Sequence, residues 1–261
     1  RWLAALRQGG ARQQAAALLL GDPQLVDPRV PHDALRKLAA LAAAARDPML
    51  LRWASAACLL PERAAACAVL PPDAWRHVEP DNAAAWLLWA ERSGADDDAL
   101  WAGLAGTTRH AQYPKSLAAT VQAALPADMP PYLRLAPLVE AIGVEHALPF
   151  VAMTRVVRGC QPPAVDQDGR RARCEALARM LVARGDDLWA TAMGAAVGRE
   201  LDWPEARVRA IRAAHEAVQA EAESLMPDQP YACAAVERLG RWVETQAARG
   251  ELPLERPWAR W

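Results

Sequence analysis

Short runs of helix-forming residues, separated by proline and glycine, dominate this sequence. Alanine is the most frequent residue, and leucine, arginine and glutamate are also common, all with high helix propensity. A sheet protein of this length would need many more β-branched and aromatic side chains. Isoleucine, however, occurs twice in 261 residues, phenylalanine once and tyrosine three times. The sequence therefore predicts an all-α fold without a sheet.

Proline and glycine positions predict where the helices begin and end. A short helix is expected before Gly9-Gly10, a second ending at Gly21, a third with Pro61 in its first turn, and a one- or two-turn helix between the proline stops of residues 71–80. The other expected helices lie near residues 33–45, 48–59, 82–93, 97–107, 114–124, 131–143, 145–158, 170–184, 186–200, 204–225 and 230–248. Helices joined by short loops are antiparallel neighbours. We therefore expect stacked antiparallel hairpins in an α-solenoid-like array.

The longest expected loop, residues 159–169, suggests how the chain is organised. It would separate an N-terminal array of hairpins at 1–158 from a C-terminal helical region at 170–261. One continuous domain is the alternative.

Residues 80–107 have the pattern of one helical hairpin. Asp81 or Asn82 can cap the first helix by accepting a backbone N–H bond. Trp86 and Ala90, one turn apart, place a large and a small residue on the same face. This stretch resembles a tetratricopeptide (TPR) repeat, in which Pro-x-Asn-x-x-x-Trp opens the first helix. Matching positions are Pro80, Asn82, Trp86, Ala90 and, in the second helix, Ala99.

The resemblance to TPR repeats is incomplete. The tyrosine usual one turn after the tryptophan is missing, and Gly103 and Gly106 stand where larger residues are common. TPR arrays repeat about every 34 residues, and no second clean copy is found. The resemblance implies a degenerate, TPR-like helical repeat. The whole chain also resembles exported, alanine-rich bacterial proteins that carry the same Pro-Asp-Asn-x-x-x-Trp feature after a cysteine pair.

Four of the five cysteines are spaced as two pairs. Cys58 and Cys67 flank one expected turn, and Cys160 and Cys174 flank the long loop. Antiparallel helices roughly 8–10 Å apart bring such pairs within disulfide reach. Two disulfides indicate a periplasmic or secreted protein, whereas buried free cysteines are the alternative. Because the chain starts at Arg1 without a methionine, we expect that an upstream segment has been removed.

Charge and hydropathy narrow the classes of partner. The net charge of −1 and the pI near 6.6 argue against a nucleic-acid partner, which requires a concentrated positive field. No apolar run approaches the ~20 residues needed to cross a bilayer. We therefore expect no membrane span.

Known catalytic and metal-binding motifs are absent from the sequence. His215 and Glu216 begin like a zinc-binding H-E-x-x-H, but Gln219 replaces the second histidine. The segment that includes Asp166 has the outline of an EF-hand calcium loop. Its first ligand position, however, is Ala164, whose side chain offers no oxygen. No catalytic residue, metal ligand or cofactor is predicted. The sequence leaves open whether the chain is an enzyme, and it favours a non-enzyme.

Two groups of residues are candidates for a binding surface. Arg109, His110, Tyr113 and Lys115 form the densest polar cluster outside the expected helices, and an ordinary solvated loop is the alternative. Trp89 lies off the packing face of its helix, and exposed tryptophans are common interface anchors. Most other tryptophans are expected in the core, among them Trp86, Trp101, Trp189 and Trp242.

These observations favour a non-enzymatic helical-repeat module that binds a protein or peptide. An inhibitor or immunity-type partner of another secreted protein is one specific version. A second hypothesis is an all-α hydrolase or lytic enzyme with dispersed acidic residues, recognisable by convergent carboxylates or a His–carboxylate pair in a deep pocket. The third is a structural or oligomerisation domain.

Overall fold

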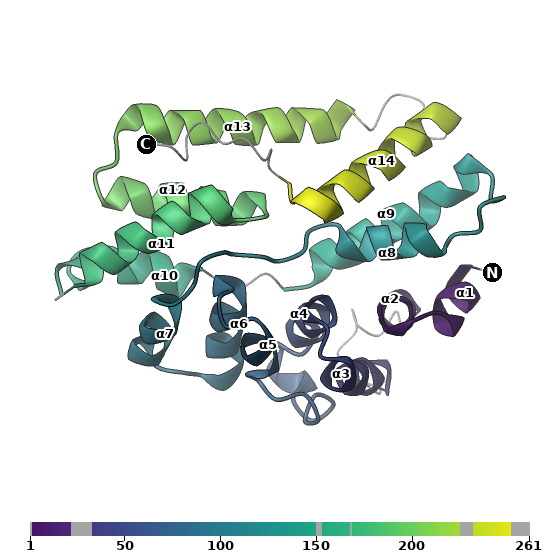
Figure 1. The fold of residues 1–261 in the computed structure, drawn as a ribbon, viewed down its shortest axis with the longest axis horizontal. Coiled ribbons are helices and arrows are strands. Elements are labelled where there is room, and N and C mark those ends of the chain that lie inside the picture. The colour runs from purple at the N-terminus through teal and green to yellow at the C-terminus, as the bar shows by residue number, and fades with distance from the viewer. Residues whose placement is uncertain (1, 22–32, 150–152, 168, 225–231, 252–261) are drawn as a thin grey trace. The chain divides into compact units, whose positions relative to one another are not determined.

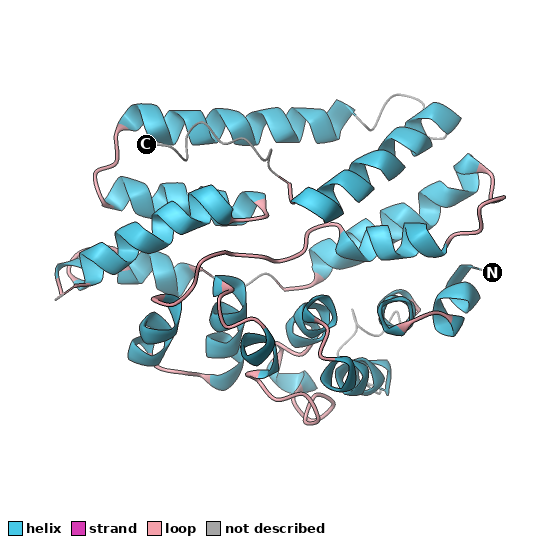
Figure 2. Cartoon of the chain, in the orientation of Figure 1, coloured by secondary structure: helices cyan, strands magenta, loops and turns pink. Residues whose placement is uncertain are grey.

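The computed structural model describes residues 2–21, 33–149, 153–167, 169–224 and 232–251, and these form helices without any strand (Figures 1 and 2). This confirms the all-α prediction. The helices are α1 (Trp2–Gln8), α2 (Ala11–Leu20), α3 (Asp33–Ala45), α4 (Pro48–Ala57), α5 (Ala74–Val78), α6 (Ala83–Ser93), α7 (Asp97–Leu104), α8 (Ser116–Ala124), α9 (Pro131–Ala147), α10 (Thr154–Gly159), α11 (Arg170–Arg184), α12 (Leu188–Glu200), α13 (Glu205–Ser224) and α14 (Cys233–Arg249), with short 3-10 turns at Pro61–Arg63 and Ala164–Asp166.

Most helix ends agree with the proline and glycine signals, and two do not. The expected break near Gly143 is wrong, since α9 continues through it. A glycine inside a helix costs only about 1 kcal/mol, which the burial of neighbours such as Leu138 and Ala141 outweighs. The helix expected from Pro61 is only the 3-10 turn Pro61–Arg63.

The chain forms two compact units, each assembled from three separate stretches. Unit 1 comprises Arg1–Glu79, Pro114–Phe150 and Leu225–Ala248, and unit 2 comprises Pro80–Tyr113, Val151–Ser224 and Arg249–Trp261. This division differs from the expected one, because residues 159–169 lie inside unit 2 and residues 1–158 contribute to both units.

In unit 1, α2 is the central helix. It packs against its sequence neighbours α1 and α3, and also against α8 and α9 from the second stretch. Leu19 of α2 and Trp53 of α4 are among the large side chains in this core. The predicted bridge between Cys58 and Cys67 is present, with the Cα atoms 5.9 Å apart, and it closes the turn after α4.

In unit 2, α12 packs against α11 and α13, and α6 packs against α7. The second predicted disulfide joins Cys160, at the end of α10, to Cys174 of α11, with a Cα–Cα distance of 5.7 Å. Both bridges predicted from cysteine spacing are therefore confirmed. Cys233, the remaining cysteine, is free and exposed.

Tryptophan–glycine contacts shape the packing of unit 2. A Cβ atom added at Gly103 of α7 would overlap the Trp86 ring of α6. This contact explains why glycine occupies a position where TPR repeats carry larger residues. Trp101 is buried as expected, whereas the core placement expected for Trp189 is wrong, because that side chain is 59% exposed.

Candidate functional site

Residues 108–113 run alongside neighbouring segments of unit 2. The backbone N–H of Thr108 donates to the Asp81 carbonyl, and the N–H of Ala83 donates to the Arg109 carbonyl. The Arg109 guanidinium also pairs with the Asp81 carboxylate, with Nε 3.0 Å from Oδ2, and it lowers the pKa of Asp81. These contacts hold the segment as an ordered connection beside the start of α6.

The residues predicted as a binding surface are placed in different environments. His110 is fully buried and Lys115 is 4% exposed, while Trp89, Arg109 and Tyr113 are half-buried. Lys115 belongs to unit 1, and the other four residues belong to unit 2. The structure therefore does not bring them together within one unit, and two of them are not surface residues.

His110 is part of a buried polar centre of unit 2 that also includes Asp186 and Asp187. Its Nδ1 lies 3.2 Å from Oδ2 of Asp187. Asp187 caps α12, where its Oδ1 accepts the N–H of Ala190 at 2.7 Å. The carboxylate of Asp186 accepts the backbone N–H groups of Gln112 at 2.8 Å and Tyr113 at 2.9 Å. One histidine and two carboxylates thus join residues 110–113 to the turn between α11 and α12.

The two carboxylates of this centre differ in their affinity for protons. Burial, and then the adjacent Asp187 charge, raise the pKa of Asp186 to about 7. Burial also disfavours the charged form of Asp187, but the facing His110 ring outweighs this effect and lowers the pKa of Asp187 below its usual value. Neighbouring carboxylates commonly separate in this way, because the two do not ionise equally well at short distance.

A second buried polar group lies in unit 1. The indole Nε1 of Trp53 donates to Ser116 Oγ at 3.1 Å, and Ser116 donates its N–H and O–H to Oε1 of Glu145 at 3.0 and 3.2 Å. Burial raises the pKa of Glu145 to about 7, although the charges of Lys115 and Arg52 oppose the shift. Lys115 Nζ also lies 2.8 Å from Nε2 of His146. These contacts fasten α8 to α4 and α9.

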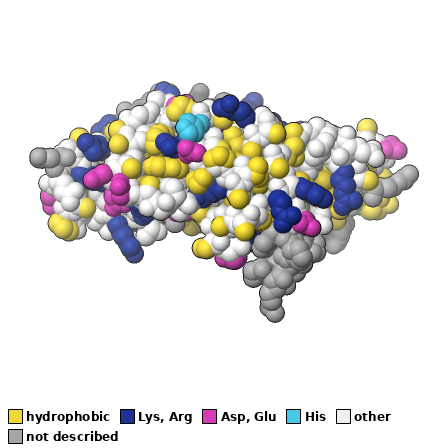
Figure 3. Space-filling model, turned by 90° about the horizontal axis from the view of Figure 1, so that it is seen from below, with side chains coloured by type: hydrophobic (Ala, Val, Ile, Leu, Met, Phe, Trp, Pro, Cys, Tyr) yellow, Lys and Arg dark blue, Asp and Glu magenta, His cyan; other side chains and the backbone are white. Residues whose placement is uncertain are grey.

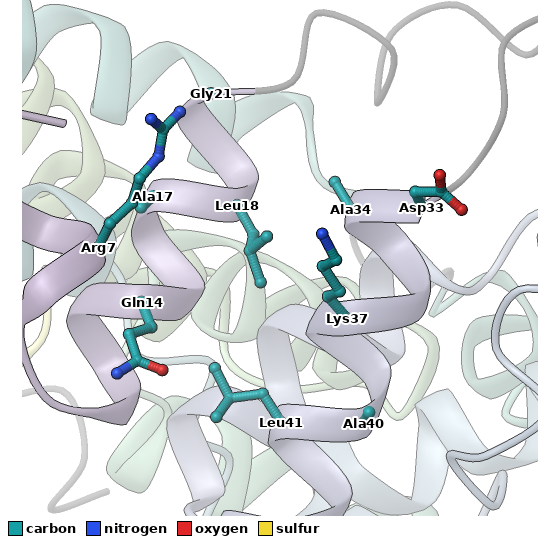
Figure 4. A pocket seen from close by; sticks show the side chains of 10 residues that line it. All are labelled: Arg7, Gln14, Ala17, Leu18, Gly21, Asp33, Ala34, Lys37, Ala40 and Leu41. Carbon is teal, nitrogen blue, oxygen red and sulfur yellow. The ribbon is translucent and has the colours of Figure 1, made fainter. Parts of the chain in front are cut away.

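A cavity of unit 1 forms a groove between α2 and α3, which we call the α2–α3 groove (Figure 4). Its volume is about 900 Å³, in the range of small-ligand and peptide sites. Leu18 of α2 and Leu41 of α3 extend into it, and small alanines line its walls (Figure 4). Its full lining is Arg7, Gln14, Ala17, Leu18, Gly21, Asp33, Ala34, Lys37, Ala40 and Leu41.

The charges at the α2–α3 groove are predominantly basic. Lys37 extends into the space beside Leu18, and Arg7 of α1 lies at the end marked by Gly21 (Figure 4). Asp33 points away from the groove and is paired with Arg36 at 2.8 Å. Within the described part of the chain, neither Arg7 nor Lys37 is paired with a carboxylate. The groove therefore combines an apolar floor with two available cations.

Sequence reasoning did not find the α2–α3 groove. One signal was present, because Lys37 and Leu41 lie one turn apart on α3, as do Gln14 and Leu18 on α2, so each helix carries a mixed polar and apolar face. Lys37 is also one of only two lysines. Which helix faces pack together, however, depends on tertiary structure.

Over the molecule's exterior, basic and acidic side chains are interspersed with hydrophobic ones on the face shown in Figure 3. This mixture agrees with the nearly balanced net charge. Among the helices described, none has the length and apolar character that a bilayer span requires.

Comparison of the chain with protein-family models, with curated proteins and with solved structures found no match.

Proposed function

We propose that this protein is a non-enzymatic binding module and that its α2–α3 groove binds an acidic amphipathic helix from a partner protein. The observation that carries the proposal is the composition of the groove. Leu18 and Leu41 provide an apolar floor, and Arg7 and Lys37 provide positive charge that no carboxylate among the described residues neutralises.

An amphipathic helix suits such a groove because it places apolar side chains on one face and charges on the flanks. Leucines at positions i, i+3, i+4 and i+7 would contact Leu18, Leu41 and the alanines between them. Glutamates beside that stripe would meet Arg7 and Lys37. Charge complementarity of this kind favours acidic over basic peptides, and it accelerates association.

The two disulfides support a site of action outside the cytoplasm. Bridges such as Cys58–Cys67 and Cys160–Cys174 persist in oxidising compartments and are rare where thiols are kept reduced. We therefore propose that the module meets its partner in the periplasm or after secretion.

The alternative hypothesis of a hydrolase draws on the buried polar centre. His110 faces Asp187, and Asp186 lies beside them, which is the type of arrangement that acid–base catalysis uses. A substrate must reach such groups, yet His110 is 0% and Asp187 2% exposed. The groove therefore supports binding more strongly than the centre supports hydrolysis.

The proposal is tested by titrating the full chain into a fluorescein-labelled amphipathic peptide of about 16 residues, with leucines on one face and glutamates on the other. We expect saturable binding by fluorescence anisotropy. Lys37→Glu should weaken it by about tenfold or more, because attraction becomes repulsion. Leu41→Ser should weaken it without changing the charge.

Arg241→Glu is the matched control, since it makes the same charge change at an exposed position of α14 in the same unit. It should bind the peptide like the wild type. A peptide with the same composition but scattered leucines should not saturate. Equal binding by Lys37→Glu and Arg241→Glu, or equal binding of both peptides, would overturn the assignment of the groove.

A further inference from the structure

The polar centre of unit 2 has a feature that acid–base pairing does not explain. His110, Asp186 and Asp187 each direct a ligand-type atom toward the others, and these atoms lie within 4.8 Å of one another. Among the residues that the structure describes, this is the only such group of three or more His, Cys, Asp or Glu side chains. The three residues come from two segments of the chain that are about 75 positions apart.

Nδ1 of His110 and Oδ2 of Asp187 form a close ion-pair contact whose geometry is not that of a hydrogen bond. They lie 3.2 Å apart, yet both atoms are buried and lack a hydrogen-bond partner, as does His110 Nε2. Buried polar atoms are normally satisfied. Two ligands of one cation, each about 2.1 Å from it, are separated by a similar distance. A cation facing both atoms would satisfy them together.

Hydrogen bonds from the backbone orient the two carboxylates. Ala190 donates to Oδ1 of Asp187, which leaves Oδ2 toward His110. Gln112 and Tyr113 donate to Asp186, whose oxygens retain further lone pairs. Such outer hydrogen bonds are typical of metal sites, where they hold the ligands in position. In this position one Asp186 oxygen lies within 4.8 Å of the ligand atoms of His110 and Asp187.

The donor set points to a particular class of ion. Two carboxylates balance the charge of a divalent cation. The imidazole favours Zn²⁺, and the carboxylates also suit Mn²⁺. Ca²⁺ and Mg²⁺ prefer oxygen ligands in larger number. We propose that His110, Asp186 and Asp187 bind one divalent transition-metal ion, with Zn²⁺ as the first candidate, and that the ion fastens residues 110–113 to the turn before α12.

The test uses the full, disulfide-bonded chain without a histidine tag, because a tag would itself bind zinc. After treatment with EDTA and dialysis, calorimetric titration with ZnSO₄ and with MnCl₂ measures stoichiometry and affinity. We expect one Zn²⁺ per chain and a higher melting temperature in excess Zn²⁺, since a ligand that binds only the folded state stabilises it. Substitution by Co²⁺ should give visible absorption that reports nitrogen and oxygen ligation.

Asp187→Asn removes the charged ligand but keeps an oxygen to cap α12, so it should fold and bind Zn²⁺ about 100-fold more weakly or worse. Circular dichroism checks its fold, and Asp186→Asn provides a second variant. Asp73→Asn is the matched control, because it makes the same change in another His–Asp pair, the exposed His77 with the half-buried Asp73, whose atoms lie 3.5 Å apart. It should bind Zn²⁺ like the wild type. Absence of stoichiometric Zn²⁺ or Mn²⁺ binding by the wild type, or unchanged binding by folded Asp187→Asn, would overturn the proposal.

Discussion

Asn82 joins the start of α6 to a distant part of the chain through one side chain. Its role as the cap of α6 follows from its place before an alanine run, and its Oδ1 does accept the N–H of Ala84. The same side chain also exchanges two hydrogen bonds with the backbone of Ala111, 29 positions away. No local pattern contains that second role, because it depends on where the chain returns. The pairing of His110 with Asp187 was out of reach for the same reason.

Glu145 leads to a prediction at the scale of one titrating group. Its pKa is raised from 4.5 to about 7 by burial, so between these values the folded protein holds a proton that the unfolded chain has released. Stability from this group is therefore complete below about pH 4.5 and is lost as pH rises through 7. The free energy of unfolding falls by about 3 kcal/mol over this pH range. Glu145→Gln, which cannot ionise, should lack it.

Urea unfolding of the wild type and Glu145→Gln from pH 4.5 to 8 measures this difference. The unfolding free energy of the wild type should fall relative to the variant as pH rises. Glu62→Gln, at an exposed position of the same unit, should follow the wild type. If the unfolding free energies of the wild type and Glu145→Gln differ by the same amount across this pH range, Glu145 ionises with its ordinary pKa and the prediction is wrong.

At the scale of elements, composition and the positions of proline and glycine located most helices. They did not show which helices pack against one another. The limits of α3 and α11 agree with the sequence-based ranges, because helix propensity and end signals are local. The continuation of α9 through Gly143 was missed, because tertiary packing outweighed a weak local penalty. The α2–α3 groove was missed for a related reason, since it depends on which helix faces meet. The TPR-like repeat and the hairpin stacking stay predictions.

Two helix caps give a prediction at this scale. Asp96 at the start of α7 accepts the N–H of Ala99 and is exposed, so Asp96→Ala should cost about 1 kcal/mol. Asn82→Ala removes a cap and also leaves the buried N–H and carbonyl of Ala111 without their side-chain partner. We expect it to cost about 3 kcal/mol. Urea denaturation with unchanged m-values measures both. Equal costs would show that the contacts with Ala111 contribute nothing.

At the scale of the whole molecule, the spacing of the cysteines was the most informative sequence feature, because it predicted the two disulfides. Both predicted bridges are present, because each closes a short loop whose flanking residues are held near one another. The division into two units could not be predicted, since each combines stretches far apart in the sequence. Local composition does not show which distant stretches of the chain fold together.

The disulfides predict a definite thiol count. Iodoacetamide should modify one cysteine in the unreduced chain, the exposed Cys233, and all five after reduction in urea. Replacing the Cys58–Cys67 pair or the Cys160–Cys174 pair by serines should cost about 2–4 kcal/mol each. Mass spectrometry of the labelled protein and urea denaturation measure the two effects. Five modified cysteines before reduction would contradict both bridges.

The alternation of the two units along the chain has a consequence for biosynthesis. Each unit draws on three stretches, so the chain passes between them five times. The first 79 residues cannot complete unit 1 until Leu225–Ala248 has been made, whereas most multidomain chains fold one domain after another as they leave the ribosome. Most of this protein must be synthesised before either unit is finished, which leaves a long interval in which a chaperone can hold the incomplete chain.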